Sequence, residues 1–491
     1  MGRARFAVAL PLCLACLASC GFSYRVVCDP SDAAITVGGE AIASGARLRL
    51  SSREVEVGAT RPGFVRYEGR LRHAGLLGVQ ELRLSLRREE YAVTIGLTEG
   101  EAGYEIDESL SGQTPFAGVL QSGTHRLRLS PKAFPEQGFE FELEGPTNLV
   151  FRPQTDAVAI ARLRPLGVYR CGSAPKQVDF SPDGSALYIT LLDGQGFDIL
   201  DWRSGRLSSV EVPVYGPSRG FVEGLFVPEH SSFLVTQMTR DMIHEYSLPS
   251  PESQRSSATA SADPTWLRSF STQGTWSKVA AYSPASDILA ISNWVSGDVS
   301  ILDYGSGRLL VKLGGIDTPR GLAFSPDGSR LAVASYGDGR LLRYDTSSWK
   351  LTDCLKRESG ALRHIVGTRD GSKLYVSDMF RGEVLEIDSA SFSVSHVYPA
   401  RHNPNTIGLS GDGRILAVSC RGPNNSGGYT LRSPERGYVL VFDTRDRSLV
   451  AKIEGGTQPT GLAICGDSVL AFSNFQDATV ELYDISRLLG P

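Results

Sequence analysis

The sequence predicts an all-β protein. Short apolar runs separated by turn residues fill the chain, and a β-rich unit recurs through its second two thirds. The 53 glycines suit a protein with many tight turns, because glycine adopts positive φ without strain. With 491 residues, 41% hydrophobic and 21% charged, the composition is that of a globular protein with more than one domain.

The first twenty residues have the pattern of a targeting segment. Two arginines precede an apolar run over 6–17, which is too short to span a bilayer. The run ends in Leu17-Ala18-Ser19-Cys20, which resembles the lipobox of bacterial lipoproteins. This resemblance implies a signal peptide over 1–19, a lipid on Cys20 and a short linker over 20–24. The alternative is an ordinary secretory signal peptide that is cut nearby.

The region that follows alternates in β fashion and divides into two modules. Its second half contains Gly-x-Thr-Pro at 112–115 and Gly-x-His at 123–125, each flanked by strand-like runs. This order resembles the PEGA domain, a small β-sandwich of bacterial envelope proteins. The resemblance implies one PEGA-like sandwich over 25–90 and a second over 91–155. The alternative is one irregular β domain of another family.

From residue 160 to 491 a unit of four strands recurs. Its most regular copy, Thr318–Asp345, has two apolar runs around a Ser-Pro-Asp-Gly turn and then a third run. The spacing between copies is 41 to 46 residues where no insertion lengthens it, which fits a four-stranded blade. Seven copies align, and their third strands end at Asp201, Ser247, Asp303, Asp345, Asp388, Asp443 and Asp484.

The second strands of these copies share one pattern. They read LYITL, FLVTQ, LAISN, LAVAS, LYVSD, LAVSC and LAFSN. They resemble the YVTN repeat of bacterial β-propellers, which are similar to NHL-repeat propellers, and this implies a seven-bladed β-propeller over 160–491. The last copy has no outer strand of its own, so we expect the strand at 166–170 to complete it and close the ring.

One face of such a ring carries the start of every first strand. The residues two before the first apolar pair are Lys176, Val222 or Glu223, Lys278, Arg320, Arg363, Asn405 and Thr460. In a chain of net charge −4, four cations around one channel mouth favour an anionic ligand. The alternative is that they are separate, solvated residues of the rim.

The ends of the second strands lie on the same face. They add polar and aromatic candidates for a binding site, namely Asn293, Trp294, Tyr336, Asp378, Arg421 and Asn474. An insertion over 422–437 follows one of these strands, and we expect it to act as a lid beside the channel.

The sequence therefore favours a non-enzymatic, monomeric lipoprotein of the bacterial envelope, periplasmic or surface-exposed. Its propeller would bind a protein, a glycan or another anionic ligand, without a cofactor. The acidic net charge argues against nucleic acid. A Ser-His-Asp hydrolase would need a Gly-x-Ser-x-Gly elbow between a strand and a helix, and the sequence shows no βα unit that could carry one.

The alternative function is a periplasmic hydrolase similar to the propeller lactonases. These hold Ca²⁺ in the channel through carboxylate and amide oxygens, and another divalent cation would use the same ligands. The candidate ligands are Glu223, Asn293, Asp378 and Asn474.

Overall fold

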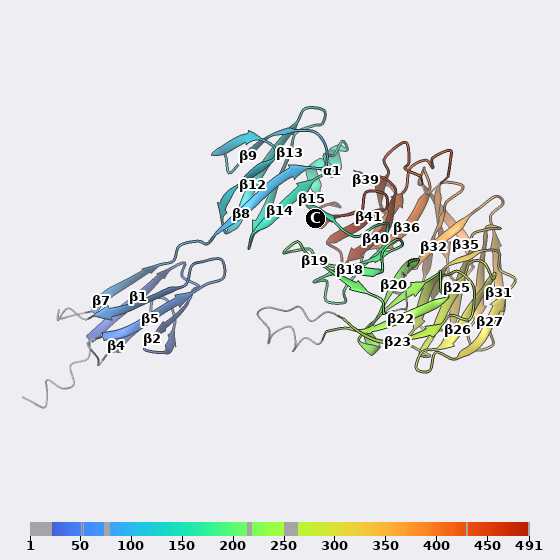
Figure 1. Cartoon of the computed structure of the whole chain (residues 1–491), viewed down its shortest axis with the longest axis horizontal. Helices are drawn as coiled ribbons and strands as arrows, with labels where there is room; N and C mark the ends of the chain where they lie inside the picture. Colours follow the sequence, from blue (N-terminus) through green and yellow to red (C-terminus); the bar gives the residue numbers. More distant parts are fainter. Residues whose placement is uncertain are drawn as a thin grey trace, which may run out of the picture. The chain divides into compact units, whose positions relative to one another are not determined.

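The chain is almost entirely β (Figure 1), so the predicted all-β class is confirmed. The only helices in the described part are α1 (Ala157–Arg162) and the 3-10 turn η1 (Pro228–His230). None of the helices described is long and apolar enough to cross a membrane. The predicted signal peptide (1–19) and lipid site (Cys20) lie outside the described residues. The computed structural model describes residues 22–50, 52, 54–72, 79–213, 219–249, 264–428 and 431–489.

Two compact units make up the chain. The first consists of residues up to 93 with 117–125 and 142–147. The second consists of residues 94–116, 126–141 and 148–491.

The first module has two sheets. One has the order β4-β1-β7, in which β1 and β7 are parallel, and the other has the order β3-β2-β5-β6. Both sheets contribute to one apolar core, which includes Val26 and Ile35. The strands are β1 (Phe22–Asp29), β2 (Ala34–Val37), β3 (Glu40–Ile42), β4 (Arg47–Leu50), β5 (Glu54–Thr60), β6 (Tyr67–Arg72) and β7 (Val79–Ser85).

Strand β1 begins inside the segment predicted to be a linker, 20–24. Its first four residues, Phe22 to Arg25, pair with Leu50 to Arg47 of β4. The pairing satisfies backbone groups that a linker would leave to solvent. Strand β1 therefore includes residues 22–24 of the segment predicted to be a linker.

The second module also has two sheets, of order β10-β9-β12-β13 and β11-β8-β14. The motif residues that suggested this module have structural roles. The buried Thr114 hydroxyl accepts a hydrogen bond from the Ala102 N–H at 3.0 Å, and the buried His125 ring bonds to the Gln121 carbonyl at 2.7 Å. The strands are β8 (Glu90–Leu97), β9 (Ala102–Ile106), β10 (Leu110–Gln113), β11 (Phe116–Gln121), β12 (Gly123–Pro131), β13 (Gln137–Leu143) and β14 (Thr147–Phe151).

Seven four-stranded antiparallel sheets follow. Six have consecutive strands, and the seventh has the order β15-β42-β41-β40. The strands of the first three are β16 (Pro175–Phe180), β17 (Leu187–Leu191), β18 (Gly196–Asp201), β19 (Arg206–Glu211), β20 (Phe221–Val227), β21 (Ser232–Gln237), β22 (Met242–Ser247), β23 (Thr265–Ser271), β24 (Ser277–Ser283), β25 (Ile288–Asn293), β26 (Asp298–Asp303) and β27 (Leu309–Gly314).

The remaining four sheets have the same plan. Their strands are β28 (Pro319–Phe324), β29 (Arg330–Ser335), β30 (Arg340–Asp345), β31 (Lys350–Lys356), β32 (Leu362–Gly367), β33 (Lys373–Asp378), β34 (Glu383–Asp388), β35 (Ser393–Pro399), β36 (Pro404–Leu409), β37 (Ile415–Cys420), β38 (Tyr438–Asp443), β39 (Leu449–Glu454), β40 (Pro459–Cys465), β41 (Val469–Asn474), β42 (Thr479–Asp484) and β15 (Arg164–Arg170).

The first strands of successive sheets contact one another in cyclic order. The sequence of contacts is β16, β20, β24, β28, β32, β36, β40 and β16 again. Strand β15 precedes the first of these sheets in the chain but pairs with β42, from Arg164 opposite Asp484 to Arg170 opposite Thr479. The seventh sheet thus receives its outer strand from residues that precede the first.

Local sequence explains the regular sheets. In the Ser-Pro-Asp-Gly turn, Ser325 Oγ donates to Asp327 at 2.6 Å and accepts from the Arg330 N–H at 2.9 Å. Gly328 has a φ of +70°, which favours glycine there. Second strands such as β25 are buried at every position because sheets pack on both of their faces.

Candidate functional site: a buried cation cluster

The same register recurs at the start of all seven first strands. In each sheet the first residue of that strand pairs with the last residue of the second strand, and a β-bulge follows, as at Pro319 opposite Ser335. In β20 the paired residue is Phe221, so Val222 and not Glu223 holds the equivalent position. The seven equivalent residues are Lys176, Val222, Lys278, Arg320, Arg363, Asn405 and Thr460.

The arginines of this set are buried. Arg320 is 4% exposed and Arg363 6%, and Arg421, which directly follows β37, is 5% exposed. Lys176 and Lys278 are half-buried. The alternative of separately solvated rim residues is therefore wrong for the arginines. We call these five residues the cation cluster.

The members of the cation cluster act on one another electrostatically. Burial, and then the charges of Arg363, Arg421, Arg320 and Lys278, hold the pKa of Lys176 well below its usual value. Burial and the two arginines at 320 and 363 lower the pKa of Lys278 to about 7. A lowered pKa of a lysine means that its surroundings disfavour the charged ammonium form.

Few acceptors neutralise the cluster. Arg320 Nη2 donates to Glu223 Oε1 at 3.2 Å, while its Nη1 is buried and has no partner in the described part of the chain. No group in the described part of the chain accepts a hydrogen bond from the guanidinium of Arg363 or the ammonium of Lys176. Asn405 is fully buried, and neither atom of its side-chain amide has a partner among the residues described. An anion at this position would supply the missing acceptors.

Aromatic rings and a thioether surround the lysines. Lys278 Nζ lies 2.8 Å from Met238 Sδ and over the rings of Trp276 and Trp294, at 5.1 and 5.5 Å from their centroids. The other lysine, Lys176, lies 5.2 Å from the Phe475 centroid.

A second carboxyl group lies beside Glu223, and the sequence does not single it out. Asp179 follows the equivalent position of β16 by three residues, and its Oδ2 is buried with no hydrogen-bond partner among the residues that the structure describes. Burial and the charge of Glu223 raise the pKa of Asp179 to about 8. Asp179 is therefore mostly neutral at pH 7, and the surroundings of the cluster stay positive.

The polar side chains at the ends of the second strands form hydrogen bonds within their own sheets. Asn293 Nδ2 donates to Asp298 Oδ1 at 2.7 Å, and Asn474 Nδ2 donates to Glu481 Oε1 at 2.7 Å. Asp378 Oδ1 accepts from the Ala361 N–H at 2.9 Å.

These three candidates for a channel metal are thus engaged inside three separate sheets. Across the described ranges, no group of three or more His, Cys, Asp and Glu side chains could hold a metal ion.

The insertion over 422–437 is held against the last sheet where the structure describes it. Arg432 Nη2 pairs with Asp477 Oδ1 at 2.9 Å, and the Ser433 N–H donates to Gln476 Oε1 at 2.9 Å. Arg436 pairs with Glu99 of the second module. These contacts hold the described part of the insertion in place, and its role as a lid beside the channel stays a prediction.

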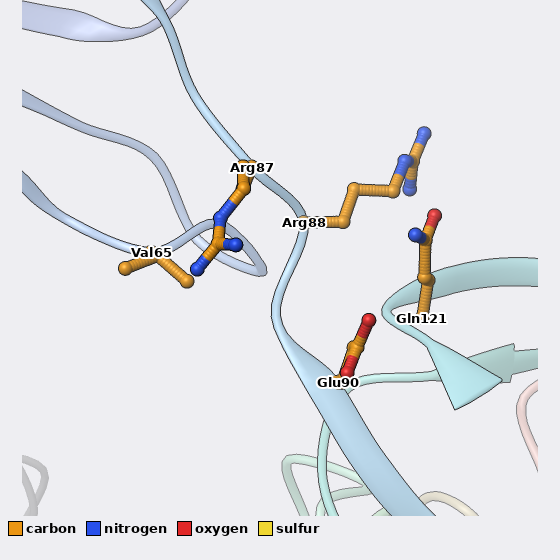
Figure 2. Close-up of a pocket in the computed structure, with 5 residues that line it drawn as sticks. All are labelled: Val65, Arg87, Arg88, Glu90 and Gln121. Atoms are coloured by element: carbon orange, nitrogen blue, oxygen red, sulfur yellow. The ribbon is translucent and has the colours of Figure 1, made fainter. Parts of the chain in front are cut away.

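A separate cavity of about 300 Å³ lies in the first unit. Figure 2 shows Arg87 beside Val65, and Gln121 and Glu90 below the extended side chain of Arg88. Arg88 Nη1 donates to the Ser122 carbonyl at 2.6 Å, so this arginine has a structural partner.

Comparison with known proteins shows to which family the chain belongs. No family model matches it. Antigen Lp49 of Leptospira interrogans serogroup Icterohaemorrhagiae serovar copenhageni (strain Fiocruz L1-130) is 34% identical over 374 residues, which are 74% of this chain and 75% of that protein. The chain belongs to the family of Antigen Lp49. The likeness to Antigen Lp49 and the all-β fold together indicate a bacterial β-rich protein.

Proposed function

We propose that this chain is a non-enzymatic protein of the bacterial envelope, and that its cation cluster binds an anionic ligand. The observation that carries the proposal is Arg363, which is 6% exposed, has no hydrogen-bond acceptor for its guanidinium among the described residues and lies among like charges. Burial of a charge is costly unless a partner compensates it. A bound anion would compensate the charge of Arg363. Because it would also reduce the repulsion among the neighbouring cations, this repulsion in the free protein would favour binding.

The proposed architecture is a seven-bladed β-propeller of the YVTN type closed by β15. Seven four-stranded sheets with cyclic contacts between their first strands support it. In this arrangement the equivalent residues of the first strands surround one channel mouth. The two modules before it would be PEGA-like spacers, which their two-sheet topologies support.

The proposed location is the envelope, with a lipid on Cys20 as the anchor. The lipobox-like sequence and the printed name of the relative, an antigen, support this. Fractionation of cells that express the full chain tests it. Cys20→Ala is expected to move the protein from the membrane to the soluble fraction and to abolish incorporation of labelled palmitate. If Cys20→Ala incorporates no labelled palmitate but stays in the membrane fraction, the proposed anchor would be contradicted.

Sulfate is a suitable probe of the anion site because it stays a dianion at all relevant pH values. Isothermal titration at low ionic strength should show one sulfate site, and Arg363→Gln should weaken it at least tenfold. Arg308→Gln removes an exposed arginine from the turn between β26 and β27, outside the cluster, and should leave the affinity unchanged. Absence of sulfate binding, or equal loss in both variants, would exclude this function.

A further inference from the structure

Apolar side chains form a continuous arc beside the cation cluster. The ring centroids of Trp294 and Tyr336 lie 5.0 Å apart, and the Tyr336 hydroxyl lies 3.7 Å from Met379 Sδ. Lys278 joins Trp294 to Trp276 through its contacts with both rings. The contacts therefore run across three successive sheets, from the one that begins with β24 to the one that begins with β32.

Part of this arc is exposed to solvent. Phe380 is 74% exposed, Val295 58% and Trp276 45%. Single exposed apolar residues are ordinary, but several that directly follow or belong to a chain of contacting rings beside a polar site mark an interaction surface. We define the aromatic arc as Trp276, Trp294, Val295, Tyr336, Met379 and Phe380.

The aromatic arc and the cation cluster adjoin. Lys278 belongs to the cluster and touches two rings of the arc. Tyr336 lies close enough to Arg320 and Arg363 to act on the titration of both. A ligand that fills both surfaces must carry a negative group and a large apolar group a few ångströms apart.

We propose that the occupant is an acidic peptide segment of a partner protein, in which a carboxylate side chain lies within two residues of a large apolar one. This inference rests on the proposed anion site and names its ligand. Asp and Glu carboxylates match the guanidinium groups of Arg320 and Arg363 in geometry and charge. Successive residues of an extended chain are about 3.3 Å apart, so such a pair can reach the cluster and the arc together.

The surface favours a peptide over two other anions. A sugar chain needs hydrogen-bonding partners for its hydroxyl groups, and the exposed side chains of Val295 and Phe380 have none to offer. A free inorganic anion would occupy the cluster but leave the apolar side chains in water. A peptide side chain would remove those side chains from water, which is favourable.

Selection of random phage-displayed octapeptides on the full chain tests the proposal. The enriched peptides should carry Asp or Glu within two positions of Phe, Trp, Leu or Ile. The affinity of one enriched peptide is then measured by fluorescence anisotropy. Phe380→Ser combined with Val295→Ser should weaken this peptide at least tenfold and sulfate less than twofold, whereas Arg363→Gln should weaken both.

The control is Leu351→Ser, which changes a half-exposed leucine of the outer strand β31 and should alter neither affinity. Enriched peptides without the acidic and apolar pair, or an affinity that the arc variant leaves unchanged, would overturn the peptide proposal while sulfate binding stands. Heparin oligosaccharides that bind through the arc, when no peptide does, would overturn it too. Loss of sulfate binding itself would overturn the anion site on which it rests.

Discussion

Arg320 and Glu223 form a hydrogen-bonded ion pair at 3.2 Å, which joins β28 to β20 past the sheet that lies between them. Glu223 is the carboxylate that pairs with the cation cluster through Arg320. We expect Glu223→Gln to raise the affinity for sulfate roughly tenfold, because one negative charge several ångströms away is worth about 1–2 kcal/mol at an effective dielectric constant near 20. The same change should lower the melting temperature of the free protein, since Arg320 loses its counter-charge.

Isothermal titration and thermal melts with and without sulfate check both effects. Glu229→Gln is the matched control, because this exposed glutamate lies in η1 at the other end of β20. An affinity that falls in Glu223→Gln would show that this carboxylate helps to hold the ligand.

We expect Arg363 to lower the thermal stability of the free protein and to strengthen sulfate binding. It is a buried cation whose guanidinium has no acceptor among the described residues. Burial and then Arg320 and Arg421 lower its pKa, and Glu223 only partly opposes them. We expect Arg363→Gln to raise the melting temperature of the free protein by about 2–4 °C, which corresponds to about 1 kcal/mol in a large domain. A variant that loses both sulfate affinity and thermal stability would show that Arg363 is part of the scaffold.

Sulfate affinity should fall as pH rises from 6 to 9. Lys278, which faces Arg320, Arg363 and Glu223, has a pKa lowered by burial and these arginines to about 7, so it loses its positive charge in this interval. Asp179, which faces Glu223, has a pKa raised by burial and that carboxylate to about 8, so it gains a negative charge. Both changes oppose anion binding, each by about tenfold.

Titrations at constant ionic strength separate the two groups. Lys278→Met should remove the part of the decrease near pH 7, and Asp179→Asn the part near pH 8. A flat profile in the unmodified protein would contradict the assigned charges.

The sequence predicts the repeated sheets well because turns and strands are local. The Ser-Pro-Asp-Gly segment that ends at Gly328 specifies its own turn, and each apolar run specifies a strand. The partner of the strand at 166–170 can also be expected, because an unpaired edge at one end of a repeat array matches a spare strand at the other.

The site is only partly predictable from the sequence, because the burial of a side chain and the direction in which it points depend on packing between sheets. Arg320 and Arg363 are found by their register, yet the sequence does not show that they are buried. Asn293 and Asn474 lie at the strand ends that the sequence predicts, but their side-chain amides donate hydrogen bonds within their own sheets. Phe380 follows a predicted strand end by two residues, and an exposed apolar residue in a turn is the signal that identifies it.

The buried ion pair of Arg152 and Glu481 offers a test of how residues after β14 support the last sheet. Arg152 Nε donates to Glu481 Oε1 at 2.7 Å, and Tyr483 donates to the second oxygen at 3.0 Å. Arg152→Met would leave the Glu481 charge buried, so we expect a loss of about 3–5 kcal/mol in the free energy of unfolding from urea melts. Adding Glu481→Gln should restore most of it. Arg164→Met breaks an exposed pair with Asp484 and should cost less than about 1 kcal/mol; equal costs at the two sites would refute this role for Arg152.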